Sequence, residues 1–200
     1  MSVNGKRMVY LVTLLAIAVV GYFAWKYTAR SAYETAAYRV LESDGSFELR
    51  EYPSLMMATT SMNFGRQGDD GSFMRLFQYI SGANDREQPV AMTTPVFMEP
   101  DNTESPGQMG FVIPQDVASA RIPEPKNDRV QIRQRDGGRF AVFRFAGRMN
   151  SATSADAEHA LLEWIDKRGW KEDGEAEFAG YDPPWTPGFL RRNEVLIRLK

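Results

Sequence analysis

The feature of the sequence that most constrains the fold is an order of secondary-structure signals that occurs twice. In each round, polar and apolar residues alternate as in strands, apolar residues then recur at helical spacing, and strand-like alternation returns. The first round covers residues 38–113, with its helix at residues 73–81, and the second covers residues 130–200, with its helix at residues 154–168. Each helix carries an apolar stripe that must pack against a sheet. The pattern therefore predicts an α+β domain of two pseudo-twofold β-α-β halves, with two helices against a curved antiparallel sheet or open barrel.

Turn-forming residues mark where these segments end. An aspartate or serine within residues 69–72 is expected to cap the first helix, and Gly82 is expected to end it. Pro95 interrupts the strand expected at residues 92–98, and because proline has no backbone N–H, we expect it at a bulge or an edge position. In the second half, the Asp-Gly-Gly sequence at residues 136–138 predicts a hairpin between the strands on either side of it.

An uncharged segment precedes the first expected strand. Residues 8–25 hold no charged side chain, and at about 1.5 Å per residue a helix of this length spans about 27 Å, close to the hydrocarbon thickness of a bilayer. Basic residues precede the segment, and Tyr22, Trp25 and Tyr27 gather at its other end, as at a membrane interface. A cleaved signal peptide is the alternative, but the terminal Tyr-Phe-Ala-Trp-Lys is a poor match to a cleavage site. The segment is predicted to be an uncleaved signal anchor, a single transmembrane helix.

The chain is therefore expected to have three parts. Residues 1–30 form the anchor with its short flanks, residues 31–37 form a tether, and residues 38–200 form the folded domain. Basic side chains flank the uncharged segment on both sides, and only the terminal amine tips the count toward an N-terminus inside the cell. We expect a single-pass membrane protein whose folded domain is periplasmic or extracellular.

Charge and cysteine content exclude several classes of function. All 26 acidic residues but only 20 of the 24 basic ones lie beyond residue 30, so this part carries a net charge of −6. Such a balance argues against nucleic acid as a partner. The chain has no cysteine, which excludes disulfides, thiolate metal sites and cysteine nucleophiles. The sequence identifies no protein partner.

Three stretches of the chain resemble the SOUL family of heme-binding proteins. They read LFQYISGAN, AMTTPV and GYDPPWTPGFLRRNEV, and they follow the family's order and spacing over essentially residues 38–200. The resemblance implies two related β-α-β halves that form a distorted antiparallel β-barrel flanked by two helices, and a function in binding heme or another tetrapyrrole. The repeated architecture is also similar to the ligand domains of bacterial regulators of the GyrI type.

The resemblance also implies a location for the ligand. The resemblance implies that the tetrapyrrole lies in an apolar groove beside the first helix and the loop before the last strand. The residues of this chain that match those places are Phe73, Phe77 and Ile80 on the helix, Tyr181, Trp185 and Phe189 in the loop, and Arg191 and Arg192 as cations for the propionate groups. Core packing alone produces the same helix face, and Trp185 is either a lid or a structural plug. An ion pair with Glu194 is the alternative role for the two arginines.

Axial ligation of a heme iron is limited by composition. His159 is the only histidine, and helical periodicity places it opposite the apolar side of its helix, so it is expected to face solvent. A heme is therefore expected to be held by apolar contacts, or by a methionine or tyrosine, without histidine ligation. The ten methionines are ordinary core fillers as well, and none stands out as a ligand.

Three function classes are compatible with the chain. The first is a membrane-tethered binding protein for heme or a related tetrapyrrole, and the second is an effector-binding module for other amphipathic small molecules. The third is an enzyme, but the sequence has no Gly-x-Ser-x-Gly, no phosphate-binding loop and no metal-ligand spacing. We expect no catalytic residues, no metal site and no enzymatic activity.

Overall fold

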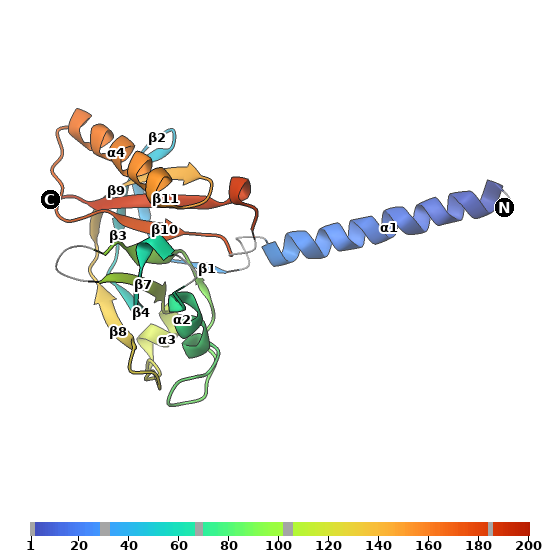
Figure 1. Ribbon diagram of the computed structural model, residues 1–200, viewed down its shortest axis with the longest axis horizontal. Coiled ribbons are helices and arrows are strands. Elements are labelled where there is room, and N and C mark those ends of the chain that lie inside the picture. The colour runs from blue at the N-terminus through green and yellow to red at the C-terminus, as the bar shows by residue number, and fades with distance from the viewer. Residues whose placement is uncertain (1–2, 29–32, 67–69, 102–105, 184–185) are drawn as a thin grey trace. The chain divides into compact units, whose positions relative to one another are not determined.

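The computed structural model describes residues 3–28, 33–66, 70–101, 106–183 and 186–200 (Figure 1). The chain divides into two compact units, Met1–Ala32 and Tyr33–Lys200, which are described separately. The first unit contains one helix, α1 (Val3–Thr28). The aromatic side chains expected at a membrane interface, Tyr22, Trp25 and Tyr27, lie outside the part that the structure describes.

The membrane anchor predicted at residues 8–25 falls within α1. Among the residues that the structure describes, no helix combines the length and the apolar character needed to cross a membrane. The anchor predicted at residues 8–25 is therefore without support from the structure.

The second unit is built on a nine-stranded antiparallel sheet with the strand order β2-β3-β9-β11-β10-β6-β7-β4-β8. The strands are β2 (Arg39–Asp44), β3 (Phe47–Tyr52), β4 (Leu55–Met62), β6 (Val96–Glu99), β7 (Gly107–Val112), β8 (Val130–Arg135), β9 (Gly138–Ala146), β10 (Glu177–Gly180) and β11 (Arg192–Arg198). A separate parallel pair joins β1 (Glu34–Thr35), within the expected tether, to β5 (Thr93–Thr94). Pro95 falls between β5 and β6, outside both ladders, and follows a cis peptide bond.

The twofold order expected from the sequence is present. The series β3-β4-α2-β6-β7 is followed by β8-β9-α4-β10-β11, where α2 is Ser72–Ile80 and α4 is Ser151–Lys167, and a short helix, α3 (Gln115–Ser119), joins the two series. The first strand of each series pairs with the second strand of the other, β3 with β9 and β8 with β4. The hairpin predicted around residues 136–138 is therefore wrong, because β8 and β9 follow each other in the chain but do not pair.

The sheet is open. β2 and β8 are its two edges, and each pairs with a single neighbour. The α+β class is thus confirmed, whereas the distorted antiparallel β-barrel implied by the family resemblance is not formed, because the sheet does not close. Closure would require the edges to meet, and the order of strands does not bring β2 to β8.

Apolar side chains form a core on each face of the sheet. One core packs beneath α2 and α4 and includes Leu76, Leu161, Ile165, Phe178, Val195 and Ile197. The other lies on the opposite face and includes Tyr52, Phe97, Phe140, Val142, Ala179 and Leu196. Neighbouring residues such as Phe178 and Ala179 enter different cores because successive strand side chains point to opposite faces.

Both ends of α2 are defined by glycines with positive φ angles and by hydrogen bonds to neighbouring residues. Gly71, with φ of 76°, is the N-cap, and the Asp70 carboxylate one residue earlier accepts a hydrogen bond from the Ser72 backbone N–H at 3.0 Å. At the other end Gly82 adopts a φ of 110° and donates its backbone N–H to the Tyr79 carbonyl, as expected for a helix-ending glycine. The chain then leaves the helix toward β5 and β6.

Candidate functional site

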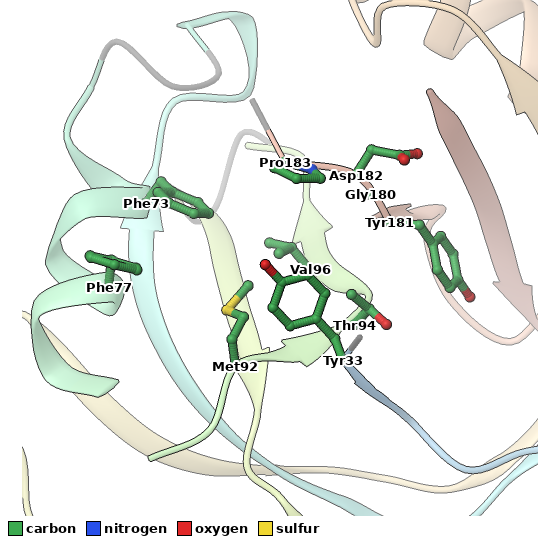
Figure 2. A pocket seen from close by; sticks show the side chains of 10 residues that line it. All are labelled: Tyr33, Phe73, Phe77, Met92, Thr94, Val96, Gly180, Tyr181, Asp182 and Pro183. Carbon is green, nitrogen blue, oxygen red and sulfur yellow. The ribbon is translucent and has the colours of Figure 1, made fainter. Parts of the chain in front are cut away.

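An apolar hollow of about 180 Å³ lies beside α2 (Figure 2). Segments from four places in the chain surround it: the residue before β1, helix α2, the β5–β6 region and the loop after β10. The lining residues are Tyr33, Phe73, Phe77, Met92, Thr94, Val96, Gly180, Tyr181, Asp182 and Pro183.

One wall of the hollow is a pair of phenylalanines on α2. Phe73 and Phe77 are four residues apart, so they lie on one face of the helix, and their rings are 6.2 Å apart and within 13° of parallel. Phe73 also contacts Phe111 of the core edge-to-face at 5.3 Å. Phe77 lies at the surface and is 44% exposed. The helix therefore presents two rings to the hollow: Phe73, which packs against the core, and Phe77, which is partly exposed to solvent.

The opposite wall comes from the segment around β5. Thr94 pairs with Thr35 of β1, and its carbonyl accepts the Ala36 backbone N–H at 2.8 Å. This pairing brings Tyr33, just before β1, to the hollow. Figure 2 shows the Tyr33 hydroxyl and the Met92 sulfur pointing together into the middle of the space. Both side chains are half-buried.

The third wall, after β10, presents carbon rather than polar atoms. Tyr181 turns its hydroxyl away from the hollow and donates it to the Glu194 carboxylate at 2.8 Å (Figure 2). Burial raises the pKa of Tyr181, and the neighbouring Glu194 charge raises it further. Asp182 also points away, and its carboxylate accepts the Arg192 backbone N–H at 2.6 Å. The lining is consequently almost entirely apolar.

Behind Tyr181 lies a buried charge cluster centred on Glu194. The Arg50 guanidinium donates to both oxygens of the Glu194 carboxylate, at 2.7 and 3.0 Å, and Arg192 donates to one of them at 3.2 Å. Arg50 also donates to the Tyr52 hydroxyl at 3.0 Å. Burial alone would raise the pKa of Glu194, but the two guanidinium groups hold it below its ordinary value. The cluster fixes Tyr181 and thereby one wall of the hollow.

The residues predicted from the sequence fall into three groups. Phe73, Phe77 and Tyr181 come together in the hollow. Ile80 is 7% exposed in the core under α2, and Phe189 is 79% exposed on a short 3-10 helix, and neither lines the hollow. Trp185 lies outside the described residues.

The two predicted arginines do not line the hollow. Arg191 donates to the Thr186 carbonyl at 2.9 Å, and Arg192 forms the ion pair with Glu194 that the sequence left as an alternative. His159 is exposed on α4 as expected, with its Nδ1 3.6 Å from the Glu163 carboxylate. Within the described part of the chain, no group of three or more histidine and carboxylate side chains is placed to hold a metal ion.

Sequence reasoning missed several lining residues. Met92 lies in the family-like stretch AMTTPV, so a signal was present, but methionine is also a common core residue. Tyr33 lies in the expected tether, and only its pairing through β1 reveals its position. Asp182 and Pro183 belong to the long C-terminal stretch and follow Tyr181 directly.

Comparison with known proteins adds independent information. A family model described as SOUL heme-binding protein matches residues 33–198. Heme-binding protein 1 of Xenopus tropicalis is 28% identical over 166 residues, which cover 77% of this chain and 84% of that protein.

Two solved structures share the fold. The C-terminal domain of EcmrR is 13% identical, with a TM-score of 0.55 over 82% of this chain and 98% of that one. An uncharacterized conserved protein from Listeria innocua is 9% identical, with a TM-score of 0.57 over 78% and 92%. At these identities the likeness concerns the fold alone.

Proposed function

The chain belongs to the SOUL heme-binding protein family, and we propose that it binds heme or a related tetrapyrrole in the hollow beside α2. The observation that carries the proposal is the position of the hollow. Its walls are the helix and the loop that hold two of the three family-like stretches, and the third stretch supplies Met92, Thr94 and Val96. A role in binding other amphipathic effectors is not favoured, because the family match points to heme.

The lining fits an apolar, flat ligand, but the volume limits how much of it enters. Ligand pockets usually measure about 300–1,000 Å³, whereas this hollow measures about 180 Å³. A tetrapyrrole would therefore extend beyond the hollow, where Phe77, which is 44% exposed, would cover part of its ring system. Apolar contact with the ring face is the main attraction in this arrangement. When bound, heme supplies an iron centre that accepts axial ligands.

The proposal is for a binding protein rather than an enzyme. The described lining offers no nucleophile beside a base and no histidine, and its one carboxylate, on Asp182, is turned away and hydrogen-bonded to the Arg192 backbone. What the residues provide is an apolar surface that shields part of a flat ligand from water.

A hemin titration of the full chain, followed by absorbance, tests the proposal. Phe77→Ala is the informative variant, because Phe77 lines the hollow and is too exposed to matter greatly for folding. Phe189→Ala is its matched control, since Phe189 is exposed and outside the hollow. We expect saturable one-to-one binding that Phe77→Ala weakens about tenfold, a loss of about 1.4 kcal/mol, and that Phe189→Ala leaves unchanged. Absence of saturable binding, or the reverse order of the two variants, contradicts the proposal.

The membrane tether and the location of the domain outside the cytoplasm stay predictions that rest on residues 8–25 and their flanking charges. Protease treatment of intact spheroplasts tests them. Digestion of the folded unit without lysis would support an external location, and protection until lysis would contradict it.

A further inference from the structure

The composition of the chain and the exposure of its histidine limit which side chains could coordinate an iron atom in the hollow. Heme iron in proteins is held by histidine, cysteine, methionine or tyrosine. The chain has no cysteine, and its single histidine, His159, is exposed on α4 and does not line the hollow. A protein ligand in this site must therefore be a thioether or a phenolate.

Three lining side chains carry such an atom: Tyr33, Met92 and Tyr181. Tyr181 is excluded by geometry, because its hydroxyl points away from the hollow and donates to the buried Glu194 carboxylate at 2.8 Å. Its raised pKa also opposes formation of the phenolate. Tyr33 and Met92 remain, with the hydroxyl and the sulfur pointing into the same space (Figure 2).

Charge separates these two candidates. A tyrosine binds iron as the phenolate, which needs a nearby cation to stabilise it in an apolar site. None of the lining residues that the structure describes is a lysine, arginine or histidine, and the one carboxylate among them, on Asp182, would oppose a second negative charge. The thioether of Met92 is neutral and has no proton to lose, so it can coordinate without burying a charge.

We propose that the sulfur of Met92 is the protein ligand to the iron of heme bound in the hollow. This inference rests on the proposed function. A thioether is a soft ligand that favours the reduced metal and raises the heme reduction potential. The site should therefore hold ferrous heme more tightly than ferric heme.

The test compares an iron-containing with an iron-free ligand on the full chain. Reduced heme and iron-free protoporphyrin IX are titrated into the wild type, Met92→Leu, Tyr33→Phe and Met74→Leu. Leucine nearly matches the volume of methionine, so the substitution removes the sulfur while retaining the packing. Met74 is an exposed methionine on α2 that does not line the hollow, which makes Met74→Leu the matched control. Thermal unfolding of each ligand-free variant checks the fold.

We expect Met92→Leu to weaken reduced-heme binding about tenfold, to lower the heme reduction potential, and to remove the thioether–iron signature from the magnetic circular dichroism spectrum. Binding of iron-free porphyrin should be unchanged, and Met74→Leu and Tyr33→Phe should retain the wild-type spectrum.

The remaining outcomes separate this inference from the proposed function. Saturable heme binding with the same spectrum and potential in Met92→Leu overturns Met92 as ligand and leaves the binding site intact. Equal weakening of both porphyrins shows a packing role and overturns it as well, as does loss of the axial signature in Tyr33→Phe instead. If the wild type binds neither porphyrin saturably, the proposed function itself fails.

Discussion

At the scale of single residues, the most consequential feature is the fully buried Glu194 between Arg50 and Arg192. Removing one partner of a buried ion pair leaves the other charge uncompensated, which typically costs about 3–5 kcal/mol. We expect Glu194→Gln to lower the free energy of unfolding by that amount, because Arg50 loses the carboxylate it contacts at 2.7 and 3.0 Å. Urea denaturation at neutral pH measures the loss. The matched control is Glu51→Gln, since Glu51 pairs with Arg39 at the surface and such a pair contributes less than about 1 kcal/mol. Similar small losses in both variants would contradict the role assigned to Glu194.

The same carboxylate predicts how stability depends on pH. Arg50 and Arg192 hold the pKa of Glu194 in the folded chain below its ordinary value of 4.5. A carboxyl group with a lowered folded-state pKa stabilises the fold fully above its ordinary pKa and loses that contribution as the pH falls through the folded-state pKa. The difference in unfolding free energy between wild type and Glu194→Gln should thus be constant near neutral pH and shrink below about pH 4.5. Urea denaturation of both proteins at a series of pH values measures it, and a difference that grows with acid would show the sign to be wrong.

Residue-level prediction from the sequence succeeded where a side chain lies on a regular face and failed where tertiary contacts decide. Phe73 and Phe77, which the resemblance placed beside a ligand groove, line the hollow, but Ile80, on the same apolar stripe, is covered by the core. Periodicity shows which residues share a face, not which part of that face stays open. Tyr33 was missed because a two-residue parallel strand leaves no pattern in the sequence.

At the scale of elements, the segment between α2 and β5 depends on one buried amide. The Asn84 side chain donates to the Tyr79 and Gln88 carbonyls, at 3.2 and 2.7 Å. Its oxygen accepts the backbone N–H groups of Arg86 and Gln88, both at 3.2 Å. Because this segment ends at Met92, which lines the hollow, Asn84 positions one wall of the hollow as well as the end of the helix.

We therefore expect Asn84→Ala to cost about 3 kcal/mol of unfolding free energy, since buried backbone groups lose their partners, and to weaken heme binding. Thermal unfolding and the hemin titration measure the two effects. Asn127→Ala is the control, because the Asn127 side-chain oxygen accepts an exposed hydrogen bond from the Arg129 backbone N–H at 3.0 Å. If the two variants unfold alike, Asn84 does not hold the segment.

The link between β8 and β9 shows how far turn residues predict the fold. Asp-Gly-Gly at residues 136–138 correctly marks the place where β8 ends and β9 begins. The predicted hairpin was wrong because each of these strands finds its partner in the other half of the fold. A turn signal is local, whereas strand pairing depends on contacts between residues far apart in sequence.

At the scale of the whole molecule, strand pairing between the two halves makes them interdependent. The order of elements was readable from periodicity, and the α+β class followed from it. Whether the sheet closes was not readable from it, so a curved or open sheet and a distorted barrel were both expected, because closure depends on whether β2 meets β8 and no local pattern encodes the distance between two edges. With β3 of the first half paired to β9 and β8 of the second half paired to β4, neither half keeps a complete set of strands alone.

This interlocking predicts that the halves unfold together. Leu76, on the inner face of α2 in the first half, is fully buried, so Leu76→Ala should lower the free energy of unfolding by about 3 kcal/mol. In native-state hydrogen exchange, amides of β9 and β11 should lose as much protection as those of β4 and β7, because all exchange through the same global opening. Leu161→Ala, at the fully buried position in α4, is the reciprocal variant and should have the same uniform effect. Protection of β9 and β11 that survives Leu76→Ala would show that the second half holds together without the first, and would contradict a single cooperative sheet.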